Sequence, residues 1–428
     1  MNGKFVAVFI FIAAYILFAL LAKRRTVTAL CASALLILTG TIPLKEAFWA
    51  INWNVMGIFV GTLVIANLFM ESRVPAYLAE IIVDKAKNTA WAILLICMLT
   101  GFISAFVENV ATVLIVAPIA LELARKLRLN PMNMMIAIAV SSNLQGTATL
   151  IGDPPSMLLG GYARMTFMDF FFYKGRPGIF FAVELGALVS FVVLYFIFRK
   201  HREKMQIIPV EKVSSWIPTI ILVSLIGALA LSSFFDTGFS YMAGVICMAT
   251  AAISILWEKF INKGLIFDGI KKLDWDTTFF LIGVFILVGS ISYTGWIGTI
   301  SDFLSGLVGS NIFLGYTLIV FISVFLSAFV DNVPFLAAML PVAGAMSAEL
   351  GVSPYLFYFG LLIGASLGGN ITPIGASANI VACGLLKKEG YEVSFKGFMK
   401  IGLPFTIVAV TAAYLFIWFI WGSFRPAQ

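Results

Sequence analysis

The sequence predicts an all-α membrane protein with ten transmembrane helices and two re-entrant hairpins, organised as two inverted repeats. Three observations predict this fold class: apolar segments of membrane-spanning length, a motif-rich stretch that occurs twice, and basic loops whose distribution gives the two copies opposite orientations. Helices are the expected spanning structure, because lipid offers no hydrogen bonds to the backbone and a helix satisfies its own.

The composition indicates an integral membrane protein. Of the 428 residues, 61% are hydrophobic and 11% are charged, and the mean hydropathy is +1.03. Soluble domains carry about 25% charged residues. The apolar segments reach the length of roughly 20 residues that crosses the hydrocarbon core. The first one, Val6 to Ala22, is followed by the basic run 23–25 and by no small-residue cleavage site, so we expect a retained span.

Several classes of protein are disfavoured. The net charge of +7 lies in short loops between spans, which is the positive-inside pattern and does not indicate a nucleic-acid partner. The only histidine, His201, lies in a basic loop, and no Ser-His, Cys-His or nucleotide-binding motif is present. We therefore expect no enzyme, no bound metal and no cofactor. The four cysteines stand singly in apolar segments, as packing residues do: Cys31, Cys97, Cys247 and Cys383.

The stretch from Ser104 to Gly152 occurs twice. Its first part, SAFVENV at 104–110, returns as SAFVDNV at 327–333, which is 223 positions later. The same offset then holds without a gap and places Gly152 on Gly375. The chain is therefore predicted to consist of a first repeat at residues 1–205 and a second repeat at residues 206–428.

Basic loops orient the first repeat. The run 23–25 marks the cytoplasmic side and places the N-terminus outside. The predicted spans are 4–22, 26–42, 54–70 and 177–198, and between the last two lie a hairpin at about 90–126 and a broken span at 131–161.

The hairpin has basic residues on both flanks, so its two arms enter and leave on the cytoplasmic side. Its tip, Glu108-Asn109, would stop near the bilayer midplane, where irregular backbone is tolerated only if it is buried in protein or lines a water-filled cavity. The next span contains Gly146, Gly152 and the pair Pro154-Pro155, and we expect it to be broken there.

The second repeat starts from the basic loop 199–204 in the opposite orientation. Its predicted spans are 216–233, 239–257, 277–294 and 402–422, with a hairpin at about 312–349 and a broken span at 354–386. No Lys or Arg occurs from Trp275 to Leu386, so the hairpin with Asp331-Asn332 at its tip is expected to open to the outside. The repeats are therefore inverted, and both termini are expected outside the inner (plasma) membrane.

Inverted repeats with broken helices are typical of secondary transporters, which bind substrate and coupling ion near the midplane. The carboxylates Glu108 and Asp331 are the candidates for proton coupling, because a carboxylate near the bilayer centre costs about 2.5–3.5 kcal/mol and is usually functional or paired. Each can also cap the second helix of its own hairpin. Asp153, which Ala376 replaces in the second repeat, is a further candidate, and Glu184 is expected to pair with a hydroxyl or another carboxylate.

Amides and hydroxyls at the tips and breaks supply neutral ligands, although some will only hold helices together. The neutral members of the predicted substrate- and ion-binding site are Asn109, Thr112, Asn143, Thr147, Thr149, Asn332, Asn370, Thr372 and Ser377, with Asn379 close to them.

The sequence resembles the ion transporter superfamily, in particular its branch of arsenite permeases (ArsB), NhaD-like antiporters and the melanosomal P protein. The resemblance covers nearly the whole chain and depends on four motifs in combination: ENVAT at 108–112, TLIGDPP at 149–155, DNVP at 331–334 and GNITPIG at 369–375. It implies a homodimer with a scaffold domain and an elevator-type transport domain that contains both hairpins.

The tips depart from the Ser-Asn-Thr motif of the dicarboxylate transporters in the same superfamily. Two fixed negative charges would repel a dianion, which argues against citrate or succinate and favours a cation or an uncharged hydroxylated solute exchanged with protons. The leading hypothesis is proton-coupled efflux of arsenite or antimonite. The alternatives are sodium/proton antiport and transport of another small inorganic or organic anion. Because no nucleotide-binding motif is present, any use of ATP would need a partner, such as the soluble ATPase that some arsenite permeases recruit.

Overall fold

The structure is a computed structural model that describes residues 3–21, 24–127, 129–203, 211–236, 238–260, 271, 273–309 and 311–422. These residues are helical apart from turns, connections and one short antiparallel pair of strands, β1 (Phe172–Tyr173) and β2 (Arg176–Pro177).

The helices of the predicted first repeat are α1 (Gly3–Leu20), α2 (Arg25–Leu38), α3 (Leu44–Ala50), α4 (Trp53–Glu71), α5 (Val74–Lys85), α6 (Thr89–Ser104), α7 (Asn109–Leu127), α8 (Met132–Gly146), α9 (Pro154–Ala163), η2 (Met168–Phe170) and α10 (Ile179–Phe198). Those of the second are α11 (Ile217–Ser232), α12 (Met242–Phe260), α14 (Trp275–Tyr293), α15 (Trp296–Val308), α16 (Ile312–Ser327), α17 (Asn332–Glu349), α18 (Tyr355–Gly368), η3 (Gly369–Ile371), α19 (Ser377–Lys388) and α20 (Phe395–Trp421).

Five of the described helices are long and apolar enough to cross a membrane, namely α4, α10, α12, α14 and α20. The pair α15 and α16 passes the same test as one segment, but it is bent by 118°. The apolar helices α1, α2, α6, α11 and α18 are shorter. The chain is thus a multi-pass membrane protein.

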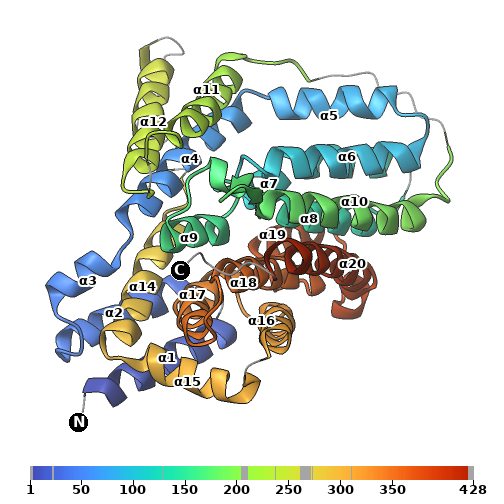
Figure 1. Cartoon of the computed structure of the whole chain (residues 1–428). Helices are drawn as coiled ribbons and strands as arrows, with labels where there is room; N and C mark the ends of the chain where they lie inside the picture. The colour runs from blue at the N-terminus through green and yellow to red at the C-terminus, as the bar shows by residue number, and fades with distance from the viewer. Residues whose placement is uncertain are drawn as a thin grey trace.

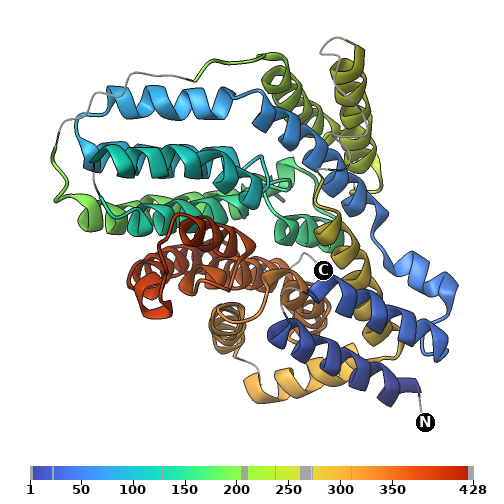
Figure 2. The ribbon, with the colours of Figure 1, turned by 180° about the vertical axis from the view of Figure 1, so that it is seen from behind.

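The helices pack as two groups (Figures 1 and 2). In the first group α4 lies along α12 and α2 lies along α14, with α1, α3 and α11 at their sides. The second group contains α6 to α10 and α16 to α20, in which α10 packs on α20 and α16 on α18. The helices α5 and α15 lie against the second group, α5 on α6 and α7, and α15 on α17. The region around residues 90–200 therefore lies beside the region around residues 310–420.

Small residues bring the helices of the first group close together. A Cβ atom on Gly283 of α14 would lie 2.7 Å from the Cβ atom of Ala29 on α2. On the other pair of helices, the Gly244 amide of α12 donates a hydrogen bond of 2.7 Å to Oδ1 of Asn54 on α4. Close backbone approach and polar bonds of this kind are what hold helices together in lipid, where burial of apolar surface contributes little.

Both broken spans end and restart at the predicted motifs. Helix α8 ends at Gly146 and α9 starts at Pro154, and in the second half α18 and η3 end at Ile371 before α19 starts at Ser377. The segment α9 packs on α17, and α19 packs on α7 and α8. The second part of each broken span thus contacts the hairpin of the other half.

Two differences from the predicted boundaries involve basic residues. Arg25, which the sequence places in a basic loop, is the first residue of α2. The last predicted span begins at residue 402, but α20 already starts at Phe395 and continues through Pro404. Its first turns carry Lys396 and Lys400, which made them resemble a loop. The short helix α3 was not predicted.

Candidate functional site

Each hairpin tip is bonded to the break that follows it in the chain. The Thr149 hydroxyl donates to the carbonyl oxygen of Ala105 at the first tip. The Thr372 hydroxyl, 223 positions later, donates to the carbonyl oxygen of Ala328 at the second tip. Backbone groups at a tip have no helical partner, and a buried carbonyl left without one costs free energy. The two threonines therefore fix tip and break to each other in the same way.

Glycine at the breaks allows this close approach. A Cβ atom on Gly152 would lie 2.9 Å from the carbonyl oxygen of Ser104, and one on Gly375 would lie 2.9 Å from that of Ser327. Real Cβ atoms essentially never come so close to other heavy atoms. The glycines thus explain why the tips can pack against the unwound chain.

A chain of amide hydrogen bonds joins the two halves behind the tips. Nδ2 of Asn109 donates to Oδ1 of Asn143 at 2.9 Å, and Nδ2 of Asn143 donates to Oδ1 of Asn370 at 3.0 Å. Nδ2 of Asn370 in turn donates to the carbonyl oxygen of Val140 at 3.3 Å. All three asparagines are buried. Buried polar groups that bond one another rigidify a core, so these amides hold the site together.

Asp153 acts as the N-cap of α9. Its Oδ1 accepts a hydrogen bond of 2.9 Å from the Ser156 amide, and its Oδ2 accepts one of 3.4 Å from the Thr147 hydroxyl. The side chain is fully buried. Ala376 at the start of α19 cannot cap, and there Nδ2 of Asn379 donates to two backbone carbonyls at 2.9 Å. A capping role accounts for Asp153 without a bound ion.

Glu108 caps its own hairpin and faces a cavity. Its Oε2 accepts a hydrogen bond of 3.0 Å from the Ala111 amide at the start of α7. The carboxylate lines a cavity of about 110 Å³ together with Asn67 of α4 and Asp274, which precedes α14. Among the described residues, no Lys or Arg forms an ion pair with Glu108. The first tip therefore presents a carboxylate to an open space between the two helix groups.

Asp331 has a different environment, because it forms an ion pair with Arg25 of α2. Oδ1 of Asp331 also accepts a hydrogen bond of 3.0 Å from the Val333 amide and so caps α17. Nη1 of Arg25 lies 3.4 Å from the Ser377 hydroxyl, to which it donates. The second tip is thus neutralised by a cation from the other helix group.

The remaining predicted residues lie within or next to the hairpin helices. The Thr112 hydroxyl donates to the carbonyl oxygen of Glu108, the residue before α7, at 3.1 Å. Asn332 is buried at the start of α17. The predicted site residues thus form three clusters. One is the buried core around Asn109, Asn143 and Asn370, and the other two are the hairpin tips at Glu108 and at Asp331.

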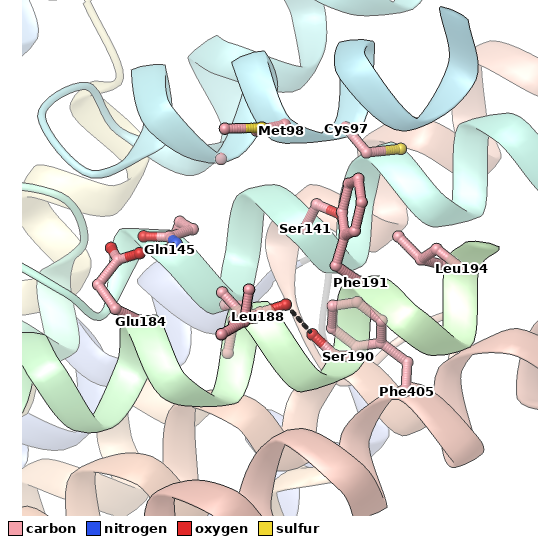
Figure 3. A pocket seen from close by; sticks show the side chains of 13 residues that line it. Cys97, Met98, Ser141, Gln145, Glu184, Leu188, Ser190, Phe191, Leu194 and Phe405 are labelled. Carbon is pink, nitrogen blue, oxygen red and sulfur yellow. Dashed lines mark hydrogen bonds between the residues drawn. The ribbon is translucent and has the colours of Figure 1, made fainter. Parts of the chain in front are cut away.

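Glu184 lies at the end of an apolar pocket (Figure 3). Nε2 of Gln145 donates to its Oε2 at 3.2 Å, so its partner is an amide and not the expected hydroxyl or carboxylate. The pocket has a volume of about 240 Å³ and lies between α6, α8, α10 and α20. Figure 3 shows mainly apolar side chains around it, among them Met98, Phe191 and Phe405.

The sequence did not indicate two residues of the site, Arg25 and Asp274. Arg25 lies 306 positions from Asp331, and Asp274 lines the cavity of Glu108 from a distant part of the chain. A partial signal was present, because Asp274 precedes an apolar helix at a position where an acidic N-cap is expected.

Two helical hairpins whose tips contact two broken helices, inside a multi-pass membrane protein, define a secondary transporter. The chain belongs to the family described as "Citrate transporter" (CitMHS), whose model matches residues 15–359. It lies in the ion transporter superfamily, as its motifs predict.

Known proteins are similar to this chain over almost its whole length. An uncharacterised transporter of Mycobacterium tuberculosis is 28% identical over 424 residues, which cover 96% of this chain and 97% of the relative. The P protein of Homo sapiens is 24% identical over 478 residues, with 92% of this chain and 57% of the relative covered. The YdaH transporter of Alcanivorax borkumensis has a similar fold, with a TM-score of 0.59, 13% identity and 98% of each chain covered.

Proposed function

We propose that the protein is a secondary active transporter that exchanges a small solute for protons, with Glu108 as the proton carrier. The observation that carries this proposal is the position of Glu108, which faces a cavity between the two helix groups without a cationic partner among the described residues. A carboxylate in such a place can take up and release a proton when its surroundings change.

Transport would proceed by movement of the second helix group, with both tips and both breaks, against the first group as scaffold. The equivalent bonds of Thr149 and Thr372 support two copies of one structural unit. In our proposal these copies are inverted in the membrane. Contacts of α9 with α17 and of α19 with α7 would keep the two copies together as they move. Because hydrogen bonds fix both tips to the breaks, the second helix group is suited to move as one rigid body.

The solute we propose is uncharged and hydroxylated, with arsenite or antimonite as the leading case. Glu108 at the first tip and Asp274 before α14 make the cavity acidic, and the Arg25 guanidinium at the second tip is already paired with Asp331. Citrate, which the family description names, carries several negative charges and would meet the carboxylates of Glu108 and Asp274, whereas Arg25 is already paired with Asp331. Hydroxyl groups would instead bond to carboxylate and amide oxygens.

Sodium is the second candidate, because the Glu108 cavity offers two carboxylates and the amide of Asn67, which are oxygen ligands of the kind hard cations prefer.

The test is to reconstitute the purified full chain into proteoliposomes and record internal pH when arsenite, antimonite, sodium or citrate is added. Proton movement driven by arsenite or antimonite would support the proposal. Movement driven only by sodium would make the protein a sodium/proton antiporter, and movement only with citrate would refute the charge argument.

A further inference from the structure

The two tip carboxylates are equivalent in sequence but differ in their partners. Glu108 faces a cavity, whereas Asp331 is paired with Arg25, and the side chains of this pair are 21% and 18% exposed. The helix that packs on α4, as α2 packs on α14, is α12. It has a single basic residue, Lys259, in its last turn. At its first turn, the position that Arg25 occupies in α2, α12 thus carries no basic residue, and no described Lys or Arg forms an ion pair with Glu108.

Arg25 is held in place by both helix groups. From the scaffold side, its Nη2 donates to the Thr277 hydroxyl of α14 at 3.1 Å, and its guanidinium lies 4.8 Å from the centre of the Phe280 ring. From the other side it contacts Asp331 and Ser377. An arginine fixed by several bonds in a partly buried place is a permanent charge, because its guanidinium does not lose its proton in proteins.

Three carboxylates face this guanidinium. Asp331 is in direct contact, Oδ2 of Asp276 lies 3.9 Å from Nε and is 64% exposed at its side chain, and Asp274 is reached through Thr277. The Thr277 hydroxyl donates to Oδ2 of Asp274 at 2.6 Å while it accepts from Arg25. Asp274 in turn lines the cavity of Glu108. The second tip is thus linked to the first through Arg25, Thr277 and Asp274.

We infer that Arg25 occupies the cation position of the second tip, so that one proton is exchanged per solute, at Glu108, and Asp331 takes no part in the exchange. This inference depends on the proposed function and deepens it. A tethered cation neutralises Asp331 in place of a proton or a metal ion. Removal of the Arg25 charge would leave Asp331 in the membrane without a partner, where it must take up a cation or proton of its own.

The experiment measures the coupling ratio in proteoliposomes with the membrane potential clamped at zero, using arsenite as the probe, or sodium if the wild type transports it instead. At a tenfold proton gradient, an uncharged solute exchanged for one proton accumulates about tenfold, and for two protons about 100-fold, because each factor of ten corresponds to the same free energy. Arg25→Gln is expected to raise the accumulation ratio from the first value to the second. Arg25→Lys, which keeps the charge, is expected to keep the wild-type ratio.

Two further variants separate this role from a structural one. The double variant Arg25→Gln with Asp331→Asn removes both charges and is expected to restore the wild-type ratio. If Arg25 only held the two helix groups together, the double variant would lose that contact as the single variant does, and its ratio would not be restored. Asp331→Asn alone is expected to slow transport at an unchanged ratio, because Asp331 carries no exchanged proton. The inference is overturned if Arg25→Gln keeps the wild-type ratio, or if Asp331→Asn lowers it. If the wild type moves no protons with any solute, the proposed function fails and the inference fails with it.

Discussion

The close contact between each break and its hairpin tip predicts that Gly375→Ala will destabilise the protein. The added Cβ atom would lie 2.6 Å from the carbonyl oxygen of Gly369 and 2.9 Å from that of Ser327. Both obstacles are backbone atoms, which cannot turn away as a flexible side chain can. Overpacking of this kind costs about 1–3 kcal/mol. The variant must therefore displace the second tip from the break.

Gly384→Ala is the matched control, because Gly384 lies in α19, the helix that follows Gly375, and nothing lies within 4 Å of its added Cβ atom. Alanine in a helix interior is more stable than glycine by roughly 0.5–1 kcal/mol. The assay is the thermal midpoint of the purified protein in detergent, together with transport in proteoliposomes. We expect a lower midpoint and little transport for Gly375→Ala, and an unchanged or higher midpoint with normal transport for Gly384→Ala. Equal behaviour of the two variants would refute the packing argument.

Substitutions at three further positions test the bonds of the site. Thr372→Val leaves the Ala328 carbonyl without its donor and is expected to cost about 1–3 kcal/mol of stability, measured by thermal unfolding. Thr250→Val on α12 is the control and should cost less, because the Thr250 hydroxyl bonds only to its own helix. Asn143→Leu breaks the amide chain at its centre, and we expect a similar loss of stability and an inactive protein. Asp153→Asn can still cap α9 and should retain transport, whereas Asp153→Ala should lower the stability of the protein by about 1 kcal/mol. Loss of transport in Asp153→Asn would instead indicate an ionic role for Asp153.

Helix boundaries and breaks were predictable from the sequence because they depend on local properties. Segment length and loop charge placed the predicted span 177–198 almost on α10, and the glycines and prolines after α8 marked the break. The charges on the flanks of the two hairpins likewise predicted that Glu108 and Asp331 lie at hairpin tips. Capping of the following helix was one of the roles expected for each carboxylate.

The partners of the tip carboxylates were not predictable. A single sequence has no signal that joins Arg25 to Asp331, and the charge pattern that locates loops assigned this arginine to a loop. Asp274 enters the cavity of Glu108 only because α14 packs between other helices of both groups. The difference between the tips, one paired and one facing a cavity, is therefore visible only in three dimensions.

The most direct test of proton coupling at Glu108 is solute-driven proton movement in proteoliposomes that contain Glu108→Gln. Glu184→Gln is the matched control, since this carboxylate is also half-buried within the helical assembly but is bonded to Gln145. We predict that Glu108→Gln moves no protons with the solute that drives the wild type, while Glu184→Gln behaves as the wild type. Undiminished proton movement in Glu108→Gln would contradict the assignment of Glu108 as the proton carrier.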